Sequence, residues 1–335
     1  MTDTPKASLS PMQKLKAHLE LLDPITWVGV LQGIVCGAIA SGRMEFSIEH
    51  IGQFALLMLL FGPLGTGFSQ SVNDYYDRDL DRVNEPSRPI PSGRLSEKEA
   101  LWNWLTVGAM ALIVGAFFAY RLGEWRGGFL FLITVFGLVV SYIYSAPPLK
   151  LKNNVLLSAP AVGISYSFIT WIAGNLLYAD LRPEVVWMGA INACIAIGLI
   201  FLNDFKSAEG DKAKGLKSLP VMIGVRGTYL VSFSLIDVAF GTFVYLMWKW
   251  EFGAMFYFSL FSFMAILATQ AMLYLDPEHG ASALEDAVQK TGLRNVVGKS
   301  DVKTHKSYLR YLVVNNGLYV LNVIFAALLI AQKPT

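Results

Sequence analysis

Acidic residues cluster in the stretch Asn73–Asp81, which reads NDYYDRDLD. On a helix that turns about 100° per residue, Asp77 lies about 60° from Asp74, and Asp81 lies about 20° from it. These three carboxylates share one face, whereas Asp79 lies about 140° away. Like charges at this spacing repel and destabilise a helix that carries them unpaired. We therefore expect the shared face to bind a cation, although a run of charges more often forms a solvated helix end.

A second acidic stretch, Asn203–Asp211, reads NDFKSAEGD. Asp204 and Asp211 repeat the seven-residue separation of Asp74 and Asp81, and each stretch begins with Asn-Asp. The match indicates a weak internal repeat, of the kind that relates two halves of a membrane protein. The candidate metal ligands are Asp74, Asp77, Asp81, Asp204 and Asp211, which together with Asn73 are also the candidate catalytic residues.

Carboxylates alone would suit either a cation pathway or a metal site, and the neighbouring basic residues favour the metal site. A cation channel would not line its mouth with positive charges. Mg²⁺, by contrast, is held by a few carboxylates and by phosphate oxygens, and Arg and Lys neutralise the remaining charge. The residues therefore predict a diphosphate-bearing substrate bound with Mg²⁺. The candidate diphosphate-binding residues are Arg88, which lies in a proline-rich loop, Lys150, Lys206 and Asn203.

Other catalytic motifs are missing from the sequence. It has neither a P-loop nor the H-E-x-x-H zinc motif, so a nucleotide-driven transporter is not expected. All four histidines lie in polar flanks or loops, where we expect solvated surface residues. They are His18, His50, His279 and His305.

The elements that carry these residues are apolar segments long enough to cross a bilayer. Of the 335 residues, 54% are hydrophobic and only 16% are charged, which excludes a disordered chain and an ordinary cytosolic enzyme. Nine segments approach the ~20 residues needed to span, so we expect an all-α membrane protein. The expected spans are 25–42, 52–73, 100–120, 128–145, 156–178, 184–203, 228–248, 253–275 and 309–331.

The distribution of the 27 Lys and Arg residues predicts how the spans are oriented. Most of them fall in the N-terminal segment and in the loops after even-numbered spans, so the N-terminus is expected in the cytoplasm and the C-terminus on the opposite side. Both acidic stretches then face the cytoplasm. We expect residues 1–24 to form a cytoplasmic tail and 25–332 a single transmembrane domain. A cytoplasmic loop insertion is expected at about 276–308, and residues 281–298 suit either short amphipathic helical turns on the cytoplasmic face or a disordered insertion.

The two acidic motifs resemble those of the UbiA-type intramembrane prenyltransferases. Asn73, Asp74, Asp77 and Asp81 match the family pattern N-D-x-x-D-x-x-x-D. The second motif has Ala208 where the family commonly has Asp, and it is similar to the N-D-F-K-S-x-E-G-D of the chlorophyll and bacteriochlorophyll synthase branch. Three further stretches support that branch: Pro24–Trp27 (PITW), Asn84–Gly93 (NEPSRPIPSG) and Tyr144–Lys152 (YSAPPLKLK).

This resemblance implies a nine-helix bundle with a central cavity capped by cytoplasmic loops. It also implies Mg²⁺-dependent transfer of a phytyl or geranylgeranyl group from its diphosphate to the propionate of a chlorophyllide or bacteriochlorophyllide. Such a protein would lie in a bacterial cytoplasmic or photosynthetic membrane. Its partners would be these two substrates, the lipid bilayer and candidate pigment-assembly proteins, with no nucleic acid.

Two alternatives stay open at this stage. A UbiA-type enzyme acting on a quinone precursor or on haem would use the same diphosphate half of the site. From another class, a cation-coupled transporter could use paired acidic helix ends.

Overall fold

The computed structural model describes residues 9–213, 215, 217–284 and 302–333. Within this part of the chain, nine helical stretches are long and apolar enough to cross a membrane, which confirms the all-α membrane fold expected from the sequence. The expectation for residues 281–298 falls largely outside the described residues. The chain divides into two units, residues 1–32 with 45–150 and residues 33–44 with 151–335. Each unit is described by itself.

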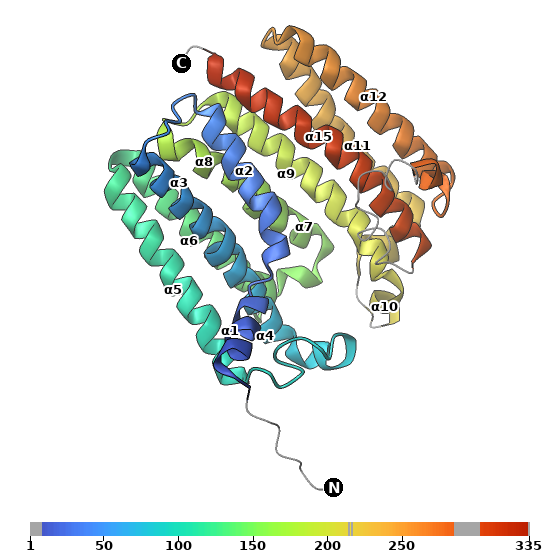
Figure 1. Cartoon of the computed structure of the whole chain (residues 1–335). Coiled ribbons are helices and arrows are strands. Elements are labelled where there is room, and N and C mark those ends of the chain that lie inside the picture. The colour runs from blue at the N-terminus through green and yellow to red at the C-terminus, as the bar shows by residue number, and fades with distance from the viewer. Residues whose placement is uncertain (1–8, 214, 216, 285–301, 334–335) are drawn as a thin grey trace, which may run out of the picture. The chain divides into compact units, whose positions relative to one another are not determined.

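Unit 1 carries the first acidic motif on α4, which packs against α5 and α6 (Figure 1). Ser96 begins α5 with a capping box, because its side chain accepts from the Glu99 amide while the Glu99 side chain accepts from the Ser96 amide. The helices of this unit are α1 Pro11–Glu20, the first turns of α2 Trp27–Ala40, α3 Ile48–Leu59, α4 Gly67–Asn84, α5 Glu97–Leu122 and α6 Glu124–Ser145.

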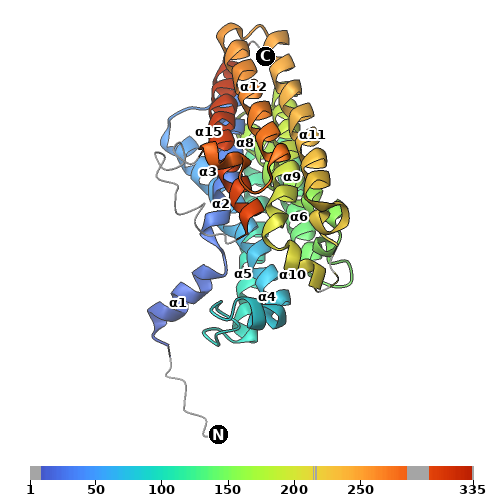
Figure 2. The same ribbon diagram turned by 90° about the vertical axis from the view of Figure 1, so that its right-hand side faces the viewer.

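Unit 2 carries the second acidic motif at the end of α9, which packs against α7, α8, α11 and α15. In both views α11, α12 and α15 run alongside one another (Figure 1, Figure 2). The helices of this unit are the rest of α2, α7 Val155–Gly163, α8 Ile169–Tyr178, α9 Pro183–Asn203, α10 Ala208–Ala213, α11 Leu219–Lys249, α12 Gly253–Leu275 and α15 Lys303–Gln332.

A π-helical segment, Leu60–Thr66, joins α3 to α4 directly upstream of the first motif. Pro63 lies inside it and has no amide hydrogen to donate, so the regular hydrogen-bond ladder is interrupted there. A comparable π-helical segment, Ile164–Phe168, follows Pro160 in unit 2. Such bulges are often found at functional sites of helical proteins.

Helix α1 lies in the segment that we expected to be a tail. Its residue Ala17 and the following Leu21 are buried with Ile90 and Leu95 of the loop after α4. The hydroxyl of Ser71 on α4 donates to the Leu21 carbonyl over 3.2 Å. Helix α1 therefore supports the loop that carries Arg88.

Close packing of α2 on α8 within unit 2 depends on two glycines. A Cβ atom added to Gly37 would lie 2.1 Å from the carbonyl oxygen of Trp171, and one added to Gly174 would lie 2.2 Å from that of Ile34. Small residues of this kind let membrane helices approach closely.

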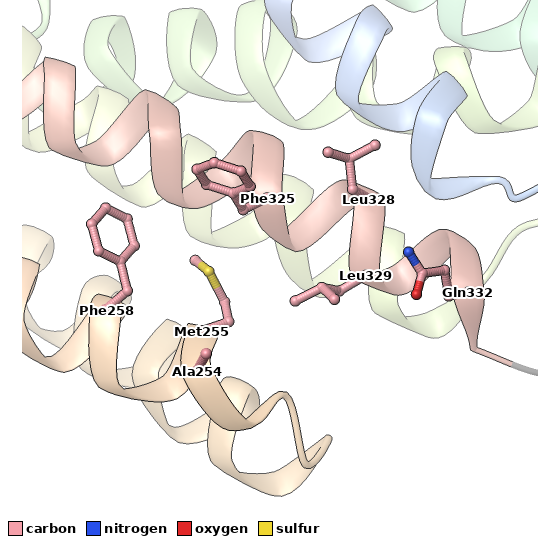
Figure 3. Close-up of a pocket in the computed structure, with 7 residues that line it drawn as sticks. All are labelled: Ala254, Met255, Phe258, Phe325, Leu328, Leu329 and Gln332. Atoms are coloured by element: carbon pink, nitrogen blue, oxygen red, sulfur yellow. The ribbon is translucent and has the colours of Figure 1, made fainter.

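An apolar groove of about 450 Å³ lies between the start of α12 and the end of α15 (Figure 3). The residues lining it are Ala254, Met255, Phe258, Phe325, Leu328, Leu329 and Gln332. It lies at the end of α15 opposite to His305, and its lining offers no charged group for chemistry.

Candidate functional site

The first motif lies on an unbroken helix, since α4 runs from Gly67 to Asn84. The predicted division of its faces is confirmed: Asp74 and Asp81 are only 9% and 7% exposed, whereas Asp79 is exposed and pairs with Arg82 at 2.7 Å. Asp77 is half-buried. Two carboxylates buried together are costly unless cations neutralise them, so this face requires positive charge.

Arg88 supplies part of that charge. Its Nη1 donates to Oδ1 of Asp74 over 2.6 Å and to Oδ2 of Asp81 over 3.3 Å. Its Nε donates to Oε2 of Glu85 over 2.7 Å. The turn that presents it is closed by the Arg88 amide, which donates to the Glu85 carbonyl over 3.0 Å, and is anchored by the buried Ile90.

Further carboxyl groups lie near Arg88. Asp23 and Glu85 lie close enough to act electrostatically on Asp74, in addition to Asp81. Burial by itself would lower the pKa of Arg88, but the hydrogen bond to Glu85 and the charges of Asp74 and Asp81 raise it above its usual value. Arg88 therefore stays protonated, and four carboxyl groups surround its guanidinium.

Asn73 begins the motif and is held by α6, since the hydroxyl of Ser145 donates to its Oδ1 over 3.0 Å. Ser145 is fully buried. Lys150 follows in the turn after α6, where its amide donates to the Ala146 carbonyl. The structure therefore brings the loop of Lys150 next to the start of the first motif.

The second motif repeats the spacing of the first but not its geometry. Helix α9 ends at Asn203, Asp204–Lys206 form a single 3₁₀ turn, and Asp211 lies on the short helix α10. Ser207 links the two parts, because its hydroxyl donates to Oδ2 of Asp211 over 2.9 Å. Asp211 and Lys206 both act electrostatically on Asp204, so these three residues form a second charged group.

His305 adjoins this second group, and its expected place on a solvated surface is wrong. It lies in the first turn of α15, is only 6% exposed, and in its Nε2-protonated tautomer donates to Oδ1 of Asn203 over 3.4 Å. Its buried Nδ1 has no hydrogen-bond partner among the described residues. The polar sequence around His305 concealed it, because its burial depends on helices that pack from elsewhere in the chain.

The comparison with protein families decides the identity. The model of the UbiA prenyltransferase family matches residues 30–285. The chain belongs to this family. The match includes both acidic motifs and ends before α15, so His305 lies outside it.

Relatives within the UbiA family include pigment synthases. The chain is 41% identical to the chloroplastic chlorophyll synthase of Oryza sativa subsp. japonica over 229 residues, which are 67% of this chain and 59% of that protein. It is 36% identical to the bacteriochlorophyll synthase 33 kDa chain of Rhodobacter capsulatus over 214 residues, 62% of this chain and 67% of that protein. The chain thus matches somewhat less than two thirds of the chloroplast protein's length.

Solved UbiA structures share the fold. A digeranylgeranylglyceryl phosphate synthase structure aligns with a TM-score of 0.71 at 20% identity, covering 95% of this chain and 99% of that one. A UbiA homolog from Archaeoglobus fulgidus bound to DMAPP and Mg²⁺ aligns with a TM-score of 0.60 at 20% identity, covering 93% of this chain and 98% of that one. At this identity the likeness shows the fold alone.

The donor chemistry of this UbiA chain fits Mg²⁺. Over the described residues, no three His, Cys, Asp or Glu side chains are arranged as a ready-made metal cage. Mg²⁺ does not need one, because it usually binds through one or two carboxylates, substrate phosphates and water. Asp74 with Asp81, and Asp204 with Asp211, offer such carboxylate pairs. The carboxyl groups gathered around Arg88 are oxygen ligands of the kind that a divalent cation prefers.

Three residues near this UbiA site were not among those selected from the sequence. Asp23 and Glu85 surround Arg88, and His305 contacts Asn203. The sequence could have indicated two of them, because Glu85 lies inside, and Asp23 lies next to, a stretch that resembles the pigment synthases. The sequence around His305 gives no indication that this residue contacts the second motif.

Replacement of His305 tests whether it positions the second motif. We expect His305→Ala to lower kcat/KM for the prenyl diphosphate about tenfold, mainly through KM, because a lost buried hydrogen bond costs about 1–3 kcal/mol. His305→Gln, which retains a donor, should recover most of the loss. The control is His279→Ala, since His279 is exposed. Equal kinetics for His305→Ala and His279→Ala, at unchanged melting temperature, would refute the role.

Proposed function

We propose that this protein transfers a geranylgeranyl or phytyl group from its diphosphate to the propionate of a chlorophyllide or bacteriochlorophyllide. The observation that carries the proposal is the buried pair Asp74 and Asp81 gathered around Arg88 at the end of a membrane helix. The acceptor is proposed from the similarity to chlorophyll and bacteriochlorophyll synthases. Mg²⁺ is proposed from the donor chemistry and from the Mg²⁺-bound UbiA homolog.

Each acidic group supplies carboxylates for Mg²⁺ in this proposal. Asp74, Asp77 and Asp81, and separately Asp204 and Asp211, would hold Mg²⁺. When bound, Mg²⁺ supplies positive charge to the phosphate oxygens of the leaving group. Arg88, Lys150 and Lys206 are the proposed cations for the remaining oxygens, and Asn73 and Asn203 contribute polar groups at the start of each motif.

The bond changes require charge stabilisation more than proton transfer. The bond between the prenyl C1 and the diphosphate oxygen breaks, and a propionate oxygen forms the new bond to C1. The negative charge that develops on the departing diphosphate is stabilised by positive groups fixed around it. A propionate is already ionised at neutral pH, so no general base is needed. The proposed site residues accordingly include no histidine that must accept a proton.

A cation-coupled transporter is disfavoured by the match of residues 30–285 to the UbiA prenyltransferase family. Other acceptors within the family are distinguished by the assay. An enzyme that transfers the prenyl group to a quinone precursor, to haem or to a glycerol phosphate lipid would bind the prenyl diphosphate in the same way and would differ in its acceptor. We also propose that the polar loops bearing both acidic groups face the cytoplasm, as the Lys and Arg distribution predicts.

The decisive experiment incubates membranes containing the protein with Mg²⁺, each prenyl diphosphate and each tetrapyrrole, and identifies products by mass spectrometry. We expect a prenyl ester of the chlorophyllide or bacteriochlorophyllide, and its loss when EDTA removes the metal. Prenyl transfer to a quinone precursor, haem or a glycerol phosphate lipid instead would overturn the proposed acceptor. Absence of any diphosphate release with every acceptor would overturn the proposed reaction.

A further inference from the structure

Arg88 contacts the same carboxylates that the proposed function assigns to the metal. Its Nη1 lies 2.6 Å from Oδ1 of Asp74 and 3.3 Å from Oδ2 of Asp81, and both aspartates are buried. A guanidinium at hydrogen-bond distance occupies one lone pair on each of these two oxygens. A divalent cation approaching them meets a like charge a few ångströms away, in surroundings where water screens little. Arg88 and the metal therefore compete for this carboxylate pair.

We infer that Arg88 is an exchangeable counter-ion, which neutralises Asp74 and Asp81 before metal binds and is displaced from them when metal binds. This inference rests on the proposed function, since it takes these aspartates as metal ligands. It explains how two buried carboxylates remain stable in the metal-free protein, because an unpaired buried charge is strongly destabilising.

Glu85 is the positioning residue for this exchange. It binds Arg88 through Nε, whereas the aspartates bind through Nη1. The guanidinium can thus leave Asp74 and Asp81 while its other edge stays attached to Glu85. The freed Nη1 then remains beside the metal site as a donor for a phosphate oxygen. Metal binding would in this way prepare the diphosphate site, so the metal enhances diphosphate binding through Arg88 as well as directly.

The same loop provides a matched control. Arg94 makes its own pair with Glu20, with Nη1 to Oε2 at 2.6 Å and Nη2 to Oε1 at 2.7 Å, and its Nη2 also donates to the Ser87 carbonyl over 2.6 Å. Replacement of Arg94 removes one positive charge from the loop without touching Asp74 or Asp81. A difference between the two arginines therefore reports the contact with the aspartates rather than the net charge.

The experiment measures Mn²⁺ binding to the purified full chain by electron paramagnetic resonance, without prenyl diphosphate and at mildly alkaline pH. We expect Arg88→Gln to bind Mn²⁺ about tenfold more tightly than the unmodified chain, because the competing cation is gone. Its affinity for geranylgeranyl diphosphate in the presence of Mg²⁺ should fall. Arg94→Gln should match the unmodified chain in both measurements.

Equal or weaker Mn²⁺ binding by a folded Arg88→Gln variant would overturn the exchange. If that variant does not fold, hydrogen–deuterium exchange of the unmodified chain provides the test. Displacement of Arg88 on addition of Mn²⁺ should change the protection of residues 85–92. Unchanged protection would overturn the proposed exchange. Asp74→Asn separates the two proposals. If Asp74→Asn lowers the number of bound Mn²⁺ ions by one, with the ion proposed at Asp204 and Asp211 retained, and Arg88→Gln leaves Mn²⁺ affinity unaltered, only the exchange fails. If Asp74→Asn leaves the number of bound Mn²⁺ ions unchanged, the metal site proposed at Asp74 and Asp81 fails as well.

Discussion

Asp74→Asn is expected to abolish prenyl transfer and to leave a folded, membrane-inserted protein. The carboxylate of Asp74 is buried on the face shared with Asp81, where charge stabilisation of the leaving diphosphate is proposed to originate. Metal-assisted stabilisation of this kind is worth several kcal/mol, so we expect a loss of about a hundredfold or more in kcat/KM. The measurement is product formation at saturating Mg²⁺, with the melting temperature recorded for each variant.

Asp79→Asn is the matched control for this experiment. Asp79 lies on the same helix but is exposed, and it pairs with Arg82, an interaction that contributes little at a surface. We expect activity within about twofold of the unmodified protein. If Asp79→Asn were as damaging as Asp74→Asn, the assignment of one functional face to α4 would be wrong.

Gly37→Ala is expected to destabilise the protein severely. The added methyl group would overlap the carbonyl oxygen of Trp171, which belongs to the backbone of α8 and cannot rotate away. Overpacking typically costs about 1–3 kcal/mol, and a backbone clash lies at the upper end of that range. The measurement is the thermal midpoint of unfolding in detergent, followed by the yield of folded protein.

Gly29→Ala provides the comparison on the same helix. An added Cβ at Gly29 meets nothing within 4 Å, so the substitution changes only helix propensity. Alanine is favoured over glycine in a helix by about 1 kcal/mol, and Gly29→Ala should therefore be neutral or mildly stabilising. Similar unfolding midpoints for Gly29→Ala and Gly37→Ala would show that α2 and α8 separate readily and that this close approach is not required.

The sequence predicted the spans and the first motif well because both depend on local patterns. Long apolar runs identify membrane helices without knowledge of their partners. The division between Asp74 and Asp79 followed from helical periodicity alone, and it holds because α4 continues unbroken to Asn84.

The second motif shows where periodicity is insufficient. Its seven-residue spacing indicated a weak internal repeat of the first motif, but α9 ends at Asn203, as the expected span 184–203 does, and the chain turns before Asp211. Ser207 lies at that turn and Gly210 follows it, and both are poor helix formers. The repeat therefore extends to the spacing of the aspartates but not to their helical geometry.

Residues brought together by tertiary packing could not be selected from the sequence. His305 follows a polar loop, yet it is buried against Asn203, which lies about a hundred residues away along the chain. Helix α1 has the polar composition of a tail, and it is held by the buried Ala17 and Leu21 and by the pair of Glu20 with Arg94. In both cases burial depends on a distant partner, which local composition does not report.

The π-helical segment Leu60–Thr66 fixes the rotational phase of everything that follows it on α4. A single-residue deletion in the α-helical turns that follow it, between Gly67 and Asn73, would rotate the downstream residues by about 100° and shift them by about 1.5 Å relative to that segment. Asp74 and Asp81 would then turn away from Arg88, although no site residue had been altered. The length of the helix between Gly67 and Asn73 is thus constrained by the geometry of the site, and single-residue insertions or deletions there would act as loss-of-function changes.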